Sequence, residues 1–62
     1  MKPDWKYAPE WANWLAMDAD QEWFWFENKP VFESGIWRRD GGRCTDAGWY
    51  TEECEDSLES KP

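Results

Sequence analysis

The clearest strand in this sequence is Glu22-Trp23-Phe24-Trp25-Phe26-Glu27. Successive side chains of a strand point to opposite faces, so Trp23 and Trp25 share one face while Phe24 and Phe26 share the other. Both faces are therefore aromatic. We expect either a central strand that is covered on both sides, or a strand with one covered face and one face that binds a partner.

The segment before this strand contains signals for a helix and for a turn. Pro9 and Glu10 suit the first turn of a helix, because proline needs no N–H donor there and the helix dipole favours an acid. We therefore expect one or two helical turns near residues 8–14. A strand-like pattern begins at about Trp14, and residues 18–21 are typical of a polar turn.

Turn residues also divide the chain after the aromatic strand. Residues 28–30 end in a proline, which lacks the N–H that a central strand needs. A third strand is expected over about 31–39, with Gly35 as a bulge or a point of close approach. The Asp-Gly-Gly turn at 40–42 then leads to a short fourth strand at 43–45.

These elements predict one small β-rich (α+β) domain that spans residues 1–62. Its architecture is a three- or four-stranded antiparallel meander with a short N-terminal helix or turn and an acidic C-terminal segment. Residues 51–62 are expected to form a short helix or a frayed acidic tail. A domain of this size buries only about 60% of the surface of its extended chain, so we expect modest stability.

Tryptophan supplies most of the apolar surface of this chain. Seven of the 62 residues are tryptophan, whereas isoleucine, valine and leucine are scarce. Each indole ring brings roughly 150–250 Å² of surface to be buried. Seven such rings offer more apolar area than a domain of this size can easily hide, so we expect part of it to stay exposed and to bind a partner.

Acidic residues outnumber basic ones by fourteen to seven, which gives a net charge of −7. The excess is concentrated in residues 46–62, which contain six acids and a single base, Lys61. Such a segment is repelled by phosphate backbones and attracted to basic surfaces. It is either a solvated tail or an acidic face that occupies the basic groove of a nucleic-acid-handling protein.

Two cysteines, Cys44 and Cys54, leave the redox state open. A disulfide between them would close a short loop and contribute up to about 3 kcal/mol in the chain-entropy model. Free thiols are the alternative, because nothing in the sequence indicates an oxidising compartment. No apolar run follows the first residues, and no stretch approaches the ~20 apolar residues of a membrane span. We therefore expect a cytoplasmic protein with no membrane partner.

Catalytic and metal-binding chemistry finds little support in the residue types present. The chain has no histidine, hence no ordinary neutral-pH base and no imidazole ligand. Asp18, Asp20 and Glu22 alternate like the first ligands of a calcium loop, but Trp23 occupies the position where such loops need glycine. We expect a hairpin turn there, with no metal and no cofactor, and a protein that is not an enzyme.

Three arginines, Arg38, Arg39 and Arg43, cluster near Trp37 and could grip a single-stranded nucleic acid. The alternative is that they pair with neighbouring acids such as Glu33 or stack on indole rings. A net charge of −7 favours the alternative. We expect no direct contact with nucleic acid.

Two resemblances extend these expectations. Pro9-Glu10-Trp11-Ala12-Asn13-Trp14, the run Asp18-Ala19-Asp20-Gln21-Glu22-Trp23 and the final Ser57-Leu58-Glu59-Ser60-Lys61-Pro62 resemble small proteins of tailed bacteriophages and prophages. This likeness implies a place of action in the bacterial cytoplasm and a role in binding host proteins.

The second resemblance is to WW domains. Trp14 and Trp37 bracket a doubly aromatic middle strand, and a proline follows the first hairpin. This likeness implies a groove between Trp37 and a middle-strand aromatic that would take an extended proline-rich peptide.

The resulting hypothesis is a non-enzymatic, phage-type protein that binds and modulates a host protein, by inhibition, at a basic nucleic-acid-binding surface. An exposed aromatic pair, Trp25 and Trp37, would hold the complex. Acids would steer the encounter, and these are Glu52, Glu53, Glu55, Asp56 and Glu59. The alternatives are a WW-like peptide-binding module and a structural, self-associating protein. A monomer or small homodimer is expected.

Overall fold

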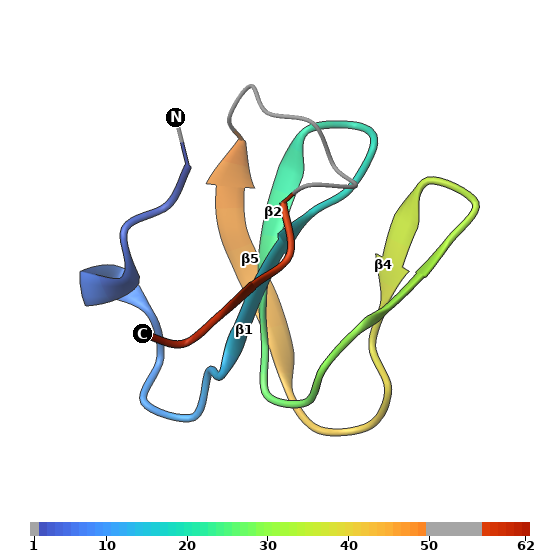
Figure 1. Cartoon of the computed structure of the whole chain (residues 1–62). Helices are drawn as coiled ribbons and strands as arrows, with labels where there is room; N and C mark the ends of the chain where they lie inside the picture. The colour runs from blue at the N-terminus through green and yellow to red at the C-terminus, as the bar shows by residue number, and fades with distance from the viewer. Residues whose placement is uncertain (1, 50–56) are drawn as a thin grey trace.

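The chain folds into a four-stranded antiparallel sheet and a separate two-stranded hairpin (Figure 1). The computed structural model describes residues 2–49 and 57–62. In chain order its elements are a 3-10 turn η1 (Trp5–Tyr7), β1 (Trp14–Met17), β2 (Glu22–Phe26), β3 (Val31–Glu33), β4 (Ile36–Arg38), β5 (Cys44–Trp49) and β6 (Glu59–Ser60). The prediction of a small, antiparallel β-rich fold is confirmed.

The doubly aromatic strand β2 lies inside the sheet, whose order is β5-β2-β1-β6. Leu15 of β1 faces Trp25 of β2, and Thr45 of β5 faces the same tryptophan from the other side. β5 pairs with β2 although the hairpin β3–β4 comes between them in the chain. The chain therefore leaves the sheet after β2, forms the hairpin β3–β4, and returns to the sheet as β5.

The turns follow the residues that the sequence marks, with one unusual choice. In the turn between β1 and β2, Gln21 has φ 71°, a left-handed conformation in which glycine is the ordinary residue. Gly41 and Gly42, with φ 73° and 68°, make the predicted turn before β5. A Cβ at Gly42 would approach the Asn28 amide at 3.0 Å, so this position also lacks room for a side chain.

The expected single strand over 31–39 is instead the hairpin β3–β4. Ser34 and Gly35 have φ 52° and 84°, which is the backbone of a two-residue hairpin turn with positive φ at both positions. Gly35 is therefore a turn residue rather than a bulge. The irregularity in strand pairing lies on β5, where the register shifts opposite Trp23 and Phe24. The predicted fourth strand at 43–45 is correct in place but extends to Trp49.

The helical turns expected near 8–14 are not formed. The N–H of Ala12 donates to the carbonyl of Pro9, and the N–H of Asn13 already donates to Phe26 of β2, so the chain turns once and enters the sheet. The helical turn lies earlier, at η1, where the Asp4 carboxylate accepts the N–H of Lys6 as an N-cap.

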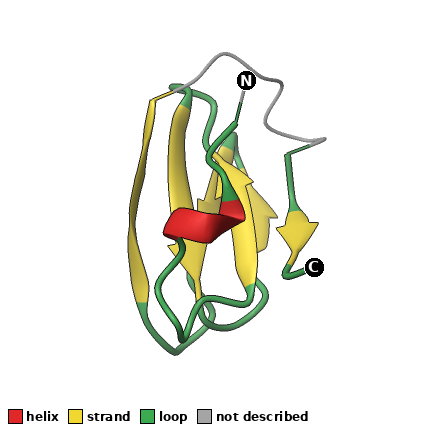
Figure 2. Ribbon diagram, turned by 90° about the vertical axis from the view of Figure 1, so that its left-hand side faces the viewer, coloured by secondary structure: helices red, strands yellow, loops and turns green. Residues whose placement is uncertain are grey.

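The N-terminal segment covers one face of the sheet. Met17, Trp23 and Trp25 of β1 and β2 are almost fully buried there, with Trp5 and Trp11 packed against the cluster that they form. The rings of Trp5 and Trp25 meet edge to face with centroids 5.0 Å apart. In Figure 2 the η1 turn lies directly in front of the strands.

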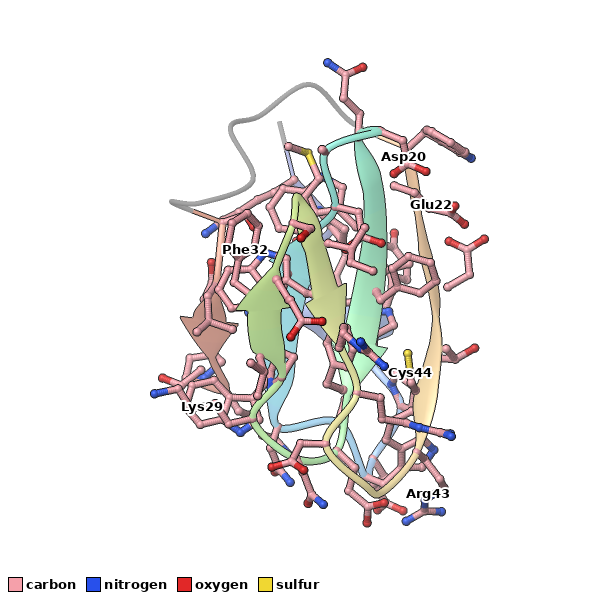
Figure 3. The ribbon with its side chains drawn as sticks, turned by 90° about the vertical axis from the view of Figure 1, so that its right-hand side faces the viewer. Asp20, Glu22, Lys29, Phe32, Arg43 and Cys44 are labelled. Atoms are coloured by element: carbon pink, nitrogen blue, oxygen red, sulfur yellow. The ribbon has the colours of Figure 1, made fainter. Side chains whose placement is uncertain are left out.

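The hairpin β3–β4 covers the opposite face (Figure 3). Ala16 and Phe26 are buried on this side, and the inner face of the hairpin carries the Phe32–Trp37 pair, with ring centroids 4.9 Å apart. A carboxylate oxygen of Asp18 accepts the N–H of Trp37 at 2.7 Å, which ties the hairpin to the end of β1. The expectation of a central strand covered on both sides is therefore correct for most of β2.

Residues 57–62 contain a short edge strand rather than a helix or a frayed tail, whereas residues 51–56 of the predicted acidic segment lie outside the described residues. β6 pairs with Trp14 and Leu15 of β1. Beyond the two residues of β6, the buried hydroxyl of Ser57 accepts the N–H of Met17 at 2.8 Å and donates to the carbonyl of the same residue at 3.3 Å. The Ser57 hydroxyl thus supplies the hydrogen bonds that the backbone of a longer β6 would make to Met17.

Replacing Ser57 with alanine should therefore destabilise the fold by about 1–3 kcal/mol, because the buried N–H of Met17 loses its acceptor. Ser60, which is exposed, is the matched control, and Ser60→Ala should change the free energy of unfolding by less than about 0.5 kcal/mol. Urea unfolding followed by tryptophan fluorescence measures both values. Equal stabilities for the two variants would contradict the role given to Ser57.

Candidate binding surface

The aromatic residues predicted to contact a partner do not form an exposed pair. Trp25 is only 4% exposed, because the N-terminal segment packs Trp5 against it. Its assignment as an exposed contact residue is wrong. Trp37 is half-buried between the hairpin and the sheet, where it pairs with Phe32. The two tryptophans also belong to different sheets, so the WW-like groove between Trp37 and the middle strand is not formed.

Of the predicted acidic contact residues, only Glu59 lies within the described part of the chain. Its carboxylate accepts hydrogen bonds from the indole N–H of Trp5 and from the ammonium group of Lys2. This carboxylate therefore fixes the N-terminal segment to β6, which is a structural role. The residues Glu52, Glu53, Glu55 and Asp56 lie outside the described residues, as does Cys54, so the predicted acidic contacts and the disulfide alternative stay predictions.

The exposed tryptophan is Trp49, which the sequence analysis did not select. Its side chain is 61% exposed at the end of β5, and its register partner on β2 is Glu22. Asp46 lies on the same strand, close enough to Glu22 for their carboxyl groups to share a hydrogen bond. The sequence feature that could have identified Trp49 is its position at the start of the acidic segment, where an indole ring lies beside a run of acids. What the sequence alone does not give is which tryptophans the other segments cover.

Negative charge accumulates around Glu22. Burial raises the pKa of this carboxyl above its ordinary value of 4.5, and repulsion from Asp46 and Asp20 raises it further. The ion pairs among the described residues are Lys2–Glu59, Arg38–Glu33 and Arg43–Glu27, so none of them neutralises these three acids. We name Trp49 with Glu22, Asp46 and Asp20 the acidic–aromatic surface; Figure 3 labels Asp20 and Glu22 side by side at one end of β2.

The carboxylates of the turn also organise the backbone. Asp20 accepts the N–H of Glu22 at 3.1 Å, and Asp46 accepts the N–H of Gly48 at 2.8 Å next to the register shift of β5. Asp18, whose pKa burial raises, accepts the N–H of Trp37. The alternating acids at 18–22 thus act as turn and docking residues. Over residues 2–49 and 57–62, no group of three or more Cys, Asp or Glu side chains is arranged to hold a metal ion.

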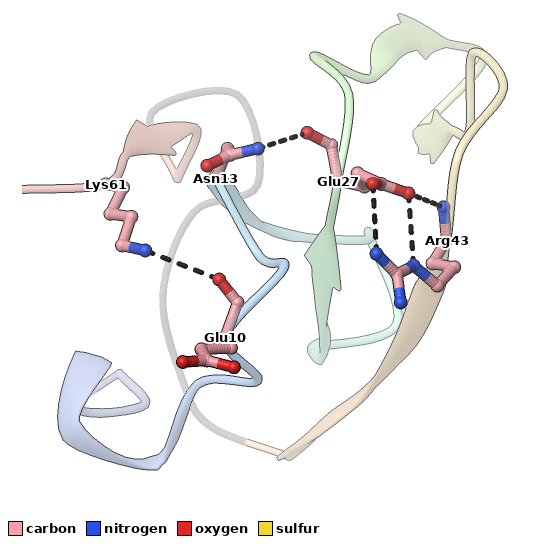
Figure 4. Close-up of polar contacts among 5 residues, drawn as sticks. All are labelled: Glu10, Asn13, Glu27, Arg43 and Lys61. Carbon is pink, nitrogen blue, oxygen red and sulfur yellow. Dashed lines mark hydrogen bonds and ion pairs between the residues drawn. The ribbon is translucent and has the colours of Figure 1, made fainter.

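Two of the three clustered arginines are engaged with acids, as the alternative to nucleic-acid binding predicts. Arg38 pairs with Glu33 at 2.7 Å across the hairpin. Arg43 donates from its guanidinium to both carboxylate oxygens of Glu27 at 3.2 Å (Figure 4), and it also lies 5.1 Å from the centre of the Trp11 ring. Each of these two guanidinium groups is thus paired with a carboxylate of the same chain.

A groove of about 440 Å³ lies beside η1. Its walls include Trp5, Ala8, Pro9, Pro62, Lys6 and Lys61. Lys61 donates to the backbone carbonyl of Glu10 at 3.5 Å and so holds the C-terminal residues against the turn after η1 (Figure 4). Because lysines line it, this groove does not extend the acidic–aromatic surface.

Comparisons with known proteins add no functional information. No family model, curated protein or solved structure matches this chain. The part of the chain that the structure describes contains no helix of the length and apolar character needed to cross a membrane.

The carboxylates Glu22 and Glu27 should show opposite pH dependence. Because the folded-state pKa of Glu22 is raised, its charge destabilises the fold at neutral pH, so Glu22→Gln should increase stability at pH 7. The gain should shrink as pH falls through that raised pKa. Hydrogen bonds from Arg43 lower the pKa of Glu27, so Glu27→Gln should decrease stability at pH 7, with the loss vanishing in acid.

Denaturant unfolding at a series of pH values between about 3 and 8 checks both variants, since this range spans the ordinary carboxyl pKa. A loss of stability for Glu22→Gln at pH 7 would contradict the electrostatic description of this surface.

Proposed function

We propose that this chain is a non-enzymatic binding protein whose partner presents a basic surface. The observation that carries the proposal is the acidic–aromatic surface, where an exposed Trp49 lies in register with Glu22 and no described cation neutralises the acids around it. Tryptophan is the residue type most often found at the energetic centre of protein interfaces. Surrounding acids accelerate encounter with a basic partner and reject acidic ones.

The likeness to small phage proteins supports one class of partner. It would be a host protein of the bacterial cytoplasm, bound and inhibited at a surface that normally contacts nucleic acid. Four acidic residues lie within seven positions after Trp49 in the chain and would extend the same charge, and these are Glu52, Glu53, Glu55 and Asp56. The proposed aromatic contact is therefore Trp49, in place of Trp25 and Trp37, which the sequence alone predicts.

Self-association is the second candidate function, because three large apolar side chains besides Trp49 are exposed: Tyr7, Val31 and Ile36. Val31 and Ile36 lie on the outer face of the hairpin and offer a small apolar contact between copies. Like charges disfavour such contacts for a chain with a net charge of −7. We therefore place self-association behind binding to a basic partner.

The partner should be recoverable from a bacterial host that expresses the tagged protein. A stoichiometric partner should co-purify at low salt and be lost at high salt, since added salt screens the attraction. Trp49→Ala should weaken that complex by at least about 2 kcal/mol, as expected for an interface hot spot. Tyr7→Ala, which removes an even more exposed ring (74%) in η1, away from the acidic–aromatic surface, should not weaken it.

Mass spectrometry identifies the partner, and the variants are then compared by titration with the purified complex components. If Tyr7→Ala and Trp49→Ala weaken the complex equally, the acidic–aromatic surface is not the contact. If the protein purifies alone as a stable oligomer, self-association takes the place of partner binding.

A further inference from the structure

Among the described strands, none pairs with the outer edge of β5. β5 is a terminal strand of the order β5-β2-β1-β6, so one of its edges pairs with β2 and the other faces away from the sheet. At six residues it is the longest strand among those described, whereas the opposite edge ends in the two-residue β6. Exposed edges of this length are ready templates for pairing with another chain.

The backbone groups that face outward can be assigned from the hydrogen bonds within the sheet. The carbonyls of Phe26 and Glu22 accept bonds from the β1 side, and the N–H of Glu27 donates to Arg43 on the β5 side. In an antiparallel sheet the bonding direction alternates along each strand. Thr45, opposite Trp25, therefore bonds inward to β2.

By the same alternation, the N–H and C=O groups of Cys44 and Asp46 point away from the sheet. These backbone groups therefore point toward the edge of β5 that no described strand covers. The side chains of both residues share the hairpin-side face with Glu22 and Phe24, because Asp46 is the register partner of Phe24. The edge thus presents two successive backbone pairing positions next to the acidic–aromatic surface.

Charge decides which occupant this edge fits. A second copy of the chain, paired β5 to β5, would bring two sets of Glu22 and Asp46 carboxylates onto one face, and like charges across strands are destabilising. Within a single copy, burial raises the pKa of Glu22, and repulsion from Asp46 and Asp20 raises it further. An incoming strand with basic side chains on that face would replace repulsion by attraction.

We infer that β5 is a docking edge that takes an extended basic segment of a partner protein as a fifth, antiparallel strand of the sheet. The inference rests on the proposed function and deepens it by specifying the partner's conformation. Lysine or arginine at every second position would lie beside Asp46 and on the same face as Glu22 of the next strand, and the residues between them would lie beside Thr45. Trp49, at the end of the same strand, would pack over the incoming segment.

A heptapeptide of alternating threonine and lysine, capped at both ends, is a direct probe. The residues of the incoming strand that bond to Cys44 and Asp46 are those whose side chains share their face, namely the lysines. Methylation of the lysine N–H groups should therefore weaken binding by about tenfold or more, because two backbone hydrogen bonds are lost. Methylation of the threonine N–H groups, which face away, should leave the affinity unchanged. The two methylated peptides carry the same charge, so each controls for the other.

Binding is measured by NMR titration of the isotope-labelled full chain, with the amide signals of Cys44 and Asp46 expected to shift most. On the protein side, Cys44→Pro removes one outward N–H, and Cys44→Ala is its matched control because both lack the thiol. Cys44→Pro should weaken the unmethylated peptide by about threefold or more, and Cys44→Ala should not. The peptide comparison does not depend on how well either variant folds.

The possible outcomes separate the two proposals. Equal affinity for both methylated peptides would overturn the docking edge and leave binding to a basic partner standing. No binding by the unmethylated peptide at millimolar concentration would also overturn the docking edge. A peptide of alternating threonine and glutamate that binds as tightly as the lysine peptide would overturn both proposals. Selective loss on lysine N–H methylation supports the docking edge.

Discussion

The rest of this structure depends on one constraint, which is that β2 carries large aromatic side chains on both of its faces. A strand of this kind is stable only where both faces are removed from water. The chain meets the requirement with two different covers. The N-terminal segment places Trp5 against Trp25, and the hairpin β3–β4 lies over the side of Phe24 and Phe26.

Each cover is held by polar contacts as well as by packing. Glu59 of β6 binds the indole N–H of Trp5 and the ammonium of Lys2, which joins the two ends of the chain. Asp18 holds the hairpin through the N–H of Trp37. Both carboxylates therefore serve the covers of β2. The carboxylates of Asp20, Glu22 and Asp46 take no part in these two contacts and lie near the exposed ring of Trp49.

Sequence patterns predict the local elements of this fold well and the covers poorly. The alternation of Trp and Phe places β2, and Pro30 with Gly41 and Gly42 place the turns around the hairpin, because these signals depend on neighbouring residues only. Gly35 is the exception, because it was expected as a bulge but forms the hairpin turn. Which segment covers which face depends on contacts between residues far apart in the chain. This is why Trp25 was assigned to the surface although Trp5 buries it. It is also why Glu59 was taken for a steering acid although it anchors Trp5 and Lys2.

The central claim is that the sheet has a covered interior and an open outer edge along β5. Native-state amide hydrogen exchange tests it most directly, because Thr45 and its neighbours on the same strand differ only in the direction of their N–H groups. The account predicts that the amides of Trp25 and Thr45 exchange only through global or near-global unfolding, whereas those of Cys44 and Asp46 exchange orders of magnitude faster. Equal protection along Cys44, Thr45 and Asp46 would contradict it, because the edge would then already be covered.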